Sequence, residues 1–341
     1  MNCRIDIRLI SQEDIIKAKC VDYYRIINVI ENSLLSYKKG DILMPDKISQ
    51  IFDEESQDRI NCMPSTLLNE KVCGVKWVSV FPYNPNKYFV PNVSGIIILS
   101  EIEKGHPFSI IDGTLITALR TACMGALAAK CFARKSSKIY GTIGTGYQAK
   151  MHFKCIKNVI KSIDTCFVSS RTSESEDDFI SEMSDVFPDV NFVKCNSNYD
   201  KATINSDIIV TAVSSQKPLL KADCIKKGAF YCHVGGYEDE YEVPLKADKI
   251  ICDDWNSLKH RGSPTIAKMY KEGILKDTDI YSNIVDILDG TKVGRANDDE
   301  FIYFNSIGLS YIDIAVAYDF YNRVCEQNYG SFWSMINDER K

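Results

Sequence analysis

The sequence lacks the patterns that mark membrane, metal-binding and nucleic-acid-binding proteins. No apolar run reaches the roughly 18 residues of a membrane-spanning helix, and the first residues, MNCRIDIRLISQEDIIKAK, carry acids where a secretory signal would be apolar. The 13 cysteines include no C-x-x-C pair, and the four histidines lack the paired spacing of a zinc site. The net charge of −5 is dispersed along the chain. We therefore expect a cytoplasmic protein with reduced, mostly buried cysteines, no metal, and neither nucleic acid nor membrane as a partner.

The composition is that of a globular chain large enough for two domains. Of the 341 residues, 45% are apolar and 26% are charged, so a large core can be buried. We find no internal repeat, low-complexity stretch or flexible linker.

Short apolar runs alternate with helical or loop stretches between about residues 138 and 316. Wholly apolar strands that alternate with helices are typical of a parallel sheet covered on both faces. This segment is therefore predicted to be a doubly wound α/β domain. Its predicted strands are KIYGTIG (138–144), TCFVSS (165–170), VNFVKC (190–195), DIIVTAV (207–213), GAFYCHVG (228–235) and KIICDD (249–254).

The part before residue 120 has a different pattern. Residues 72–82 and 92–111 are typical of long antiparallel strands, with a turn at 103–107. A helix is predicted over 114–134 and leads into the α/β domain. A final helix is predicted over 311–327, ending near Gly330 and returning to the first domain.

The stretch KIYGTIGTGYQAK (138–150) is a candidate dinucleotide loop. Gly144, Gly146 and Ala149 fit G-x-G-x-x-A between an apolar strand and a helix predicted from Tyr147 to about Val159. The glycines permit a tight turn and close approach to a pyrophosphate, which the helix N-terminus favours. Tyr147 and Gln148 begin that helix and are candidates for cofactor contact. An ordinary turn is the alternative.

The end of the second strand bears on the choice between NAD and NADP. An acid at this point holds the ribose 2′-hydroxyl of NAD, whereas a basic residue suits a 2′-phosphate. The chain has Ser169, Ser170, Arg171 and Thr172 there, which favours NADP. Acids that follow would oppose a phosphate if they folded close, and otherwise they form a solvated helix start; they are Glu174, Glu176, Asp177 and Asp178.

Five motifs together resemble the ornithine cyclodeaminase/μ-crystallin family. They are LRTACMGALAAK (119–130), GVKW (74–77), HVGG (233–236), FNSIGLSYID (304–313) and the G-x-G-x-Q-A loop (144–149). Within the family, three stretches are similar to the dehydrogenases of 2,3-diaminopropionate biosynthesis: DRINCMPS (58–65), ICDDWNS (251–257) and residues 294–315.

The resemblance implies a fold and an assembly. A Rossmann domain, residues 123–316, would be inserted into an α+β substrate-binding and dimerisation domain built from residues 1–122 and 317–341. Two subunits would join through the sheets of the substrate domains.

The resemblance also implies that Lys76 and Arg120 hold a substrate carboxylate. Charged residues in an apolar strand and an alanine-rich helix are rarely buried unless paired, so an anionic ligand would explain both. Two snorkelling surface cations are the alternative. Arg59 and Lys47 lie where this family gathers basic residues, and each has a structural role as its alternative. Asn92 occupies a position that is Thr in the cyclodeaminases and could add a hydrogen bond.

Further cofactor contacts are implied only by position in the family's pattern. Ser306 and Gly308, in the NSIG turn, would lie against the nicotinamide. Thr211, Ser214 and Pro218 would border the adenosine or nicotinamide half.

One position departs from the cyclodeaminase pattern. An Asp follows HVGG in those enzymes and handles the substrate amine, and Tyr237 stands there in this chain. A phenol with a pKa near 10 replaces an ionised carboxylate poorly at neutral pH. Glu238 or Asp239 could replace that Asp, although we expect both to be acids on the surface of a loop.

The implied reaction is the NAD(P)-dependent oxidation of N-(1-amino-1-carboxy-2-ethyl)-glutamate to 2-oxoglutarate and 2,3-diaminopropionate, for a siderophore or antibiotic. Lys76 is the candidate catalytic group, since desolvation can bring a lysine pKa into the useful range. A PLP-dependent synthase would be the pathway partner. Ornithine cyclodeaminase activity and a μ-crystallin-like NADPH binder with slow imine reduction remain alternatives.

Overall fold

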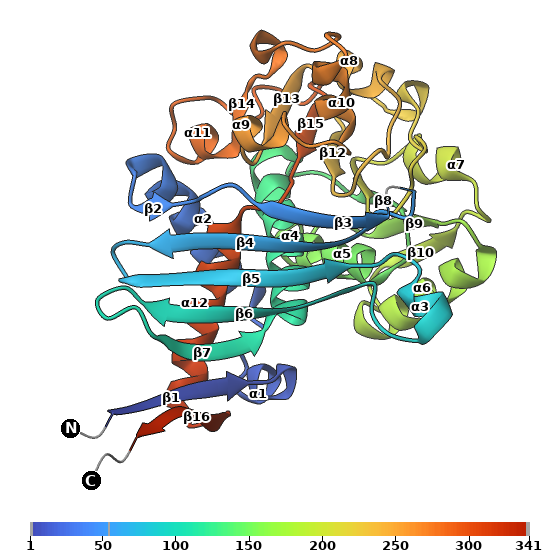
Figure 1. The fold of residues 1–341 in the computed structure, drawn as a ribbon. Coiled ribbons are helices and arrows are strands. Elements are labelled where there is room, and N and C mark those ends of the chain that lie inside the picture. The colour runs from blue at the N-terminus through green and yellow to red at the C-terminus, as the bar shows by residue number, and fades with distance from the viewer. Residues whose placement is uncertain (1–2, 54, 339–341) are drawn as a thin grey trace. The chain divides into compact units, whose positions relative to one another are not determined.

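The computed structural model describes residues 3–53 and 55–338, and the chain divides into two compact units (Figure 1). The first unit combines Met1–Arg120 with Leu309–Lys341, and the second is the continuous segment Thr121–Gly308. The second junction precedes the expected 316/317 boundary. Residues 309–316 belong to the first unit because helix α12 (Ser310–Glu326) packs on that unit's sheet.

The first unit is built on an eight-stranded sheet in the order β16-β1-β7-β6-β5-β4-β2, with β3 paired to β4. The predicted antiparallel strands are present as β5, β6 and β7. The strands are β1 (Cys3–Ile10), β2 (Ile42–Leu43), β3 (Ile48–Asp53), β4 (Asp58–Leu67), β5 (Val72–Val80), β6 (Val93–Glu101), β7 (Pro107–Asp112) and β16 (Ser331–Asp338). Strand β16 was not predicted, because it depends on pairing with β1 at the other end of the chain.

Helices cover one face of this sheet. In β4, Asn61, Met63, Ser65 and Leu67 are buried and alternate with partly exposed residues, as expected for a strand with one covered face. Helix α12 packs across β4 to β7 and against α2. The other helices of this unit are α1 (Gln12–Lys17), α2 (Tyr23–Lys39) and α3 (Asn84–Tyr88).

Helix α4 (Gly113–Phe132) continues from the first unit into the second. The Asp112 carboxylate accepts hydrogen bonds from the N–H groups of Thr114 and Leu115 and so caps the helix. In the described part of the chain, α4 is the one helix long and apolar enough to cross a membrane by length and composition. Because 78% of its most apolar window is buried inside the protein, it has the character of a core helix.

The second unit contains the predicted doubly wound sheet. Its eight strands are all parallel, in the order β10-β9-β8-β11-β12-β15-β13-β14. They are β8 (Ile139–Ile143), β9 (Thr165–Ser169), β10 (Asn191–Lys194), β11 (Ile208–Thr211), β12 (Phe230–His233), β13 (Lys249–Cys252), β14 (Ser282–Asn283) and β15 (Ile302–Asn305). Strands β14 and β15 were not predicted. They are short, and their partners β12 and β13 are distant in sequence.

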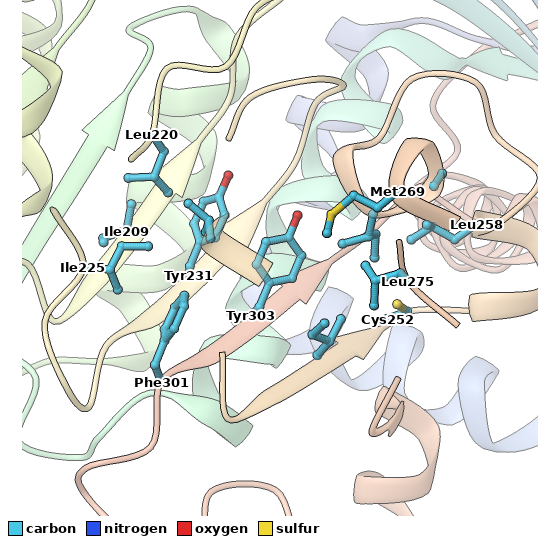
Figure 2. Packing of buried hydrophobic residues seen from close by; sticks show 14 of the residues in the cluster. Ile209, Leu220, Ile225, Tyr231, Cys252, Leu258, Met269, Leu275, Phe301 and Tyr303 are labelled. Atoms are coloured by element: carbon cyan, nitrogen blue, oxygen red, sulfur yellow. The ribbon is translucent and has the colours of Figure 1, made fainter. Parts of the chain in front are cut away.

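Helices separate these strands and bury both faces of the sheet. Every residue of β11, β12, β13 and β15 is buried. The helices are α5 (Tyr147–Val159), α6 (Ser173–Val186), α7 (Tyr199–Thr203), α8 (Glu242–Lys246), α9 (Trp255–Leu258), α10 (Thr265–Lys271) and α11 (Ile284–Leu288). Figure 2 shows part of the core, where Tyr231, Phe301 and Tyr303 pack among aliphatic side chains.

Among the described residues, the cysteines form no disulfide and most are buried. In the same part of the chain, no group of three His, Cys, Asp or Glu side chains is arranged to hold a metal ion.

Candidate active site

A buried charged cluster in the first unit has Asp313 at its centre. Lys76 comes from the middle of β5, Arg120 from α4 and Asp313 from the start of α12. Lys76 Nζ and Arg120 Nε lie 2.7 Å and 2.9 Å from the same oxygen, Asp313 Oδ1. Lys76 also donates to Thr117 Oγ1 at 3.4 Å. Lys76, Arg120 and Asp313 are only 1%, 7% and 0% exposed.

The electrostatics of this cluster leave an excess of positive charge. Burial lowers the pKa of Lys76 to about 8, although the Asp313 carboxylate opposes the change. Two cations share one carboxylate, and Asp313 Oδ2 has no hydrogen-bond partner within the described chain. The expectation that a ligand explains both buried cations was therefore incomplete. Asp313 is one anion beside two cations, so the three side chains together carry one excess positive charge.

Arg59 lies on the same face of the sheet as Lys76. Met63 pairs with Lys76, and Arg59 is four residues earlier in β4, where it pairs with Val80. Because side chains alternate along a strand, this spacing keeps the face but places Arg59 roughly 13 Å along the strand direction. Its Nη1 donates to Gln57 O at 2.8 Å, and burial lowers its pKa.

Two further candidates flank this sheet. Asn92 directly precedes β6, at the end of the sheet that holds Arg59. Lys47 directly precedes β3, and extending the register of β3 with β4 places it beside Met63, the partner of Lys76. Lys47 thus lies one residue before the end of β3 that pairs with Cys62, and Asn92 lies near the end of β4 that holds Arg59.

In the second unit, the glycine loop follows β8 and leads directly into α5, as predicted. Gly144 has a φ of +110°, which side chains rarely adopt, and a Cβ there would lie 2.6 Å from Ala212 O. Among the described residues, nothing lies within 4 Å of a Cβ built on Gly146, and no side chain caps α5 at Tyr147 and Gln148. The loop therefore offers space and an uncapped helix N-terminus, which fit a pyrophosphate.

The residues after β9 form a turn around a buried acid. Ser170 N donates to Glu176 Oε1 at 2.9 Å, and Ser170 Oγ donates to Thr172 O at 3.0 Å. Glu176 is 0% exposed and accepts two further backbone hydrogen bonds, each of 2.8 Å. The side chains of Arg171 and Thr172 are exposed.

Two of the four acids thought to oppose a 2′-phosphate are therefore engaged elsewhere. The carboxylate of Glu176 is taken up by backbone N–H groups, and Asp177 pairs with Lys194 at 2.5 Å. Glu174 and Asp178 are exposed on α6.

At the end of β11 and in the loop that follows it, one candidate is buried and two are exposed or partly exposed. Thr211 is buried and donates through Oγ1 to Glu238 Oε2 at 2.6 Å. Its side chain is thus directed at Glu238, which was not anticipated. Ser214 is exposed, and Pro218 is partly exposed.

The NSIG turn is held by Asp253. Its Oδ2 accepts hydrogen bonds from Ser306 Oγ at 2.8 Å, Ile307 N at 2.9 Å and Gly308 N at 3.0 Å. Burial raises the pKa of Asp253 to about 6, although these hydrogen bonds oppose the rise. Ser306 and Gly308 are both buried, so the turn is rigidly fixed at the carboxyl end of β15.

The segment after HVGG differs from the expected surface loop. Glu238 and Asp239 are both 0% exposed and hydrogen-bonded within the second unit, so they are not surface acids. Tyr237 is partly exposed, and its ring lies 6.0 Å from that of Tyr241 and 5.2 Å from Lys268 Nζ. Burial and neighbouring carboxylates raise the pKa of Tyr237, so the phenol keeps its proton at neutral pH.

Sequence reasoning missed the roles of Asp313, Asp253 and Glu238. Each is an acid that the fold buries. The available signal was an acid within an apolar run or at its end, as in YIDIAVA and KIICDD. YEDEYE carries no such signal, because its many charges are typical of a solvated loop.

Comparison with known proteins agrees with the motifs. The model of the ornithine cyclodeaminase/mu-crystallin family matches residues 8–328. An N-((2S)-2-amino-2-carboxyethyl)-L-glutamate dehydrogenase from Staphylococcus aureus is 29% identical over 309 residues, covering 89% of this chain and 91% of that protein.

Two solved structures are similar over nearly the whole chain. The Delta(1)-pyrroline-2-carboxylate reductase of Thermococcus litoralis, in complex with NADH and L-proline, has a TM-score of 0.89 at 28% identity and covers 95% of this chain and 99% of its own. An archaeal alanine dehydrogenase dimer with bound NAD has a TM-score of 0.88 at 28% identity, with coverages of 97% and 100%. The predicted resemblance is confirmed, and this chain belongs to the ornithine cyclodeaminase/μ-crystallin family.

Proposed function

We propose that this family member is a cytoplasmic NAD(P)-dependent oxidoreductase that oxidises N-((2S)-2-amino-2-carboxyethyl)-L-glutamate to 2,3-diaminopropionate and 2-oxoglutarate. The observation that carries the proposal is the buried cluster of Lys76, Arg120 and Asp313, which retains one positive charge. A carboxylate suits this cluster, because charge-assisted hydrogen bonds are strong where water is excluded. The similar dehydrogenase of Staphylococcus aureus supports this choice of substrate.

The substrate has three carboxylates, so more than one cationic site is needed. Lys47 lies one residue before Ile48, whose partner Cys62 is next to the partner of Lys76 in β4, and Arg59 lies further along the face of the sheet that holds Lys76. We assign one substrate carboxylate to Lys76 with Arg120, and the others to Lys47 and Arg59. Asn92 is assigned a supporting hydrogen bond at the end of the sheet that holds Arg59.

The second unit supplies the residues for the dinucleotide. Gly144, Gly146 and the start of α5 would hold the pyrophosphate, and the exposed Arg171 would face a 2′-phosphate. The end of β9 has Ser169 and Ser170 where NAD enzymes place an acid, which favours NADP. Bound NAD(P) would serve as the acceptor of a hydride.

Lys76 is the proposed proton-transfer group. Loss of hydride from the glutamate Cα leaves a C=N bond, to whose carbon water adds. The C–N bond then breaks, so that nitrogen leaves with 2,3-diaminopropionate and oxygen stays on 2-oxoglutarate. With a pKa of about 8, the ammonium group of Lys76 can give a proton to the departing nitrogen and regain one from the hydroxyl group that the added water forms on the carbon. A synthase that uses PLP is the proposed supplier of the substrate, for a siderophore or antibiotic.

We propose oxidation rather than ornithine cyclodeamination because of the residues that follow HVGG. The position that should carry a carboxylate holds the protonated phenol of Tyr237. We infer that neither Glu238 nor Asp239 replaces it, since both carboxylates are buried and bonded inside the second unit.

We expect purified protein to form reduced nicotinamide when given N-((2S)-2-amino-2-carboxyethyl)-L-glutamate, with a lower KM for NADP than for NAD. The measurement is absorbance of the reduced nicotinamide, with 2-oxoglutarate quantified alongside. Alanine, L-proline and ornithine serve as comparison substrates in the same assay. Faster turnover of one of these, or release of ammonia from ornithine without net reduction, would contradict the proposed substrate.

We also propose that the protein is a homodimer joined through the outer face of the first unit's sheet. Ile48, Cys62, Trp77 and Ile96 form one row across β3 to β6, on the face opposite Lys76. Ile48, Trp77 and Ile96 are 63%, 42% and 44% exposed, which is unusual for large apolar side chains in adjacent strands.

Trp77→Asp should therefore convert the dimer to a monomer, because a carboxylate in the centre of an apolar interface is left unpaired. Light scattering after gel filtration measures the mass. Val186→Asp is the control, since Val186 is 51% exposed on α6 of the second unit. A Trp77→Asp protein of unchanged mass, or a parent that is already monomeric, would refute this interface.

A further inference from the structure

Glu238 is a buried carboxylate that the proposed reaction does not use. It accepts hydrogen bonds from Thr211 Oγ1 at 2.6 Å, Val213 N at 2.7 Å and Gly235 N at 2.9 Å. Two of these donors lie at or after the end of β11, and the third lies in the loop after β12. One carboxylate therefore ties together two loops at the carboxyl edge of the sheet.

These loops adjoin the glycine loop. Strands β8 and β11 are neighbours in the sheet. From β8 the chain continues to β9, towards one edge of the sheet, and from β11 it continues to β12, towards the other edge. Folds of this kind hold dinucleotides in the crevice between two such strands. A Cβ on Gly144 would lie 2.6 Å from Ala212 O and 2.9 Å from Val213 Cγ1. A Cβ on Gly235 would overlap Glu238 Oε1 and lie 2.7 Å from Val213 O. The loops are thus in close contact, with Glu238 at their junction.

A buried histidine beside Glu238 is held by a buried tyrosine. Figure 2 shows the hydroxyl groups of Tyr231 and Tyr303 pointing the same way, and that of Tyr303 lies 2.6 Å from His233 Nδ1. His233 Nε2 lies 3.4 Å from Glu238 Oε2. Although burial opposes it, Asp239 and Glu238 raise the pKa of His233.

We propose that Glu238 is a positioning residue for the dinucleotide, which fixes the loops after β11 and β12 against the glycine loop. This inference rests on the proposed function, because it assumes a dinucleotide at Gly144 and Gly146. Without the carboxylate, the N–H groups of Val213 and Gly235 lose their acceptor, and the loops after β11 and β12 are no longer held in place in the unliganded protein. The dinucleotide would then bind at the expense of reordering the loops.

The test is titration of full-length protein with NADH and with NADPH, followed by the fluorescence of the reduced nicotinamide. Glu238→Gln puts an amide among three donors and should weaken binding roughly tenfold or more. The KM for the dinucleotide should rise while the KM for the amino-acid substrate is unchanged. A loss of stability alone would not produce that split.

Asp239→Asn is the matched control. Asp239 is adjacent and equally buried, and its Oδ1 accepts from Thr265 Oγ1 at 2.7 Å. Within the described chain its carboxylate bonds to none of the loop N–H groups. We expect Asp239→Asn to lower stability but to bind dinucleotide within about twofold of the parent.

Thr211→Val removes one donor while keeping the side chain's shape, and should weaken binding less than Glu238→Gln. If Glu238→Gln does not fold, the dinucleotide affinity of Thr211→Val tests the role of Glu238 in its place. The inference is overturned if Glu238→Gln binds the dinucleotide as tightly as the parent protein does. If Glu238→Gln does not fold, parent-like affinity in Thr211→Val overturns it. It is also overturned if Asp239→Asn weakens dinucleotide binding as much as Glu238→Gln does. A parent protein that binds neither NADH nor NADPH refutes the proposed function, and this inference with it.

Discussion

Replacing Lys76 with methionine should lower kcat/KM about 100-fold or more and leave dinucleotide affinity unchanged, without lowering the stability of the protein. The loss follows from the proposed roles of Lys76 in holding a carboxylate and transferring protons, since general acid–base catalysis contributes about 100-fold or more. The dinucleotide loops lie in the other unit, which explains why binding should persist. Steady-state kinetics and NADPH titration measure both quantities.

The stability of the Lys76→Met protein is the more discriminating quantity. A pKa lowered from 10.5 to about 8 means that folding disfavours the protonated lysine by about 3 kcal/mol. Methionine removes this penalty and has a similar volume, and Asp313 keeps Arg120 as its partner at 2.9 Å. The free energy of unfolding at neutral pH should therefore be equal to or greater than that of the parent.

The pH dependence gives a second check on the same residue. Because the folded-state pKa of Lys76 lies below the unfolded value, its penalty is complete below about pH 8 and is lost as the pH rises towards 10.5. In urea unfolding, the advantage of Lys76→Met over the parent should thus shrink as the pH rises from about 8 towards about 10. Lys71→Ala is the control, since Lys71 has a side chain that is 65% exposed and pairs with Glu103 on the surface. A Lys76→Met protein with parent-like kcat/KM would remove Lys76 from the site.

Asp313→Asn should destabilise the protein by about 3 to 5 kcal/mol, because it leaves two buried cations without their shared anion. Lys76 and Arg120 both bond to Asp313 Oδ1. The carboxylate also raises the pKa of Lys76, so its removal should lower that pKa below about 8. Turnover should fall, because Lys76 and Arg120 lose the group that holds them in position. Chemical unfolding and kcat/KM are the measurements.

Asp319→Asn is the matched control on the same helix. Asp319 pairs with Arg25 at 2.6 Å, and the Arg25 side chain is 50% exposed, so this pair should contribute less than about 1 kcal/mol. The double variant Lys76→Met with Asp313→Asn should recover part of the stability lost in Asp313→Asn, because one uncompensated cation is then absent. If Asp313→Asn is as stable as Asp319→Asn, the central role of Asp313 is wrong.

Local sequence was sufficient to predict the main features of the second unit. The bounds of α5 were predicted as Tyr147 to about Val159, and the structure has Tyr147–Val159. The tight turn at Gly144 was also predicted, and its φ of +110° explains why glycine stands there. These features depend on residues a few positions apart, so the sequence carries them directly.

The counter-ion of the candidate site could not be predicted in the same way. Lys76 and Arg120 were singled out as charged residues in apolar surroundings, and both are buried. Their partner Asp313 is 193 residues from Arg120 in the chain, and only the packing of α12 on the sheet brings it there. Strands β15 and β16 were missed for the same reason, since their partners are distant.

The sequence by itself determined the alternation of strands and helices, the glycine turn, and Lys76 and Arg120 as candidate site residues. Each of these features depends on residues that are a few positions apart in the chain. Only the tertiary structure decided which acids are buried and what they bind. Glu238 and Asp313 both became internal anions through contacts between separate elements. Burial of a charge depends on every segment that surrounds it, and no local pattern contains that information.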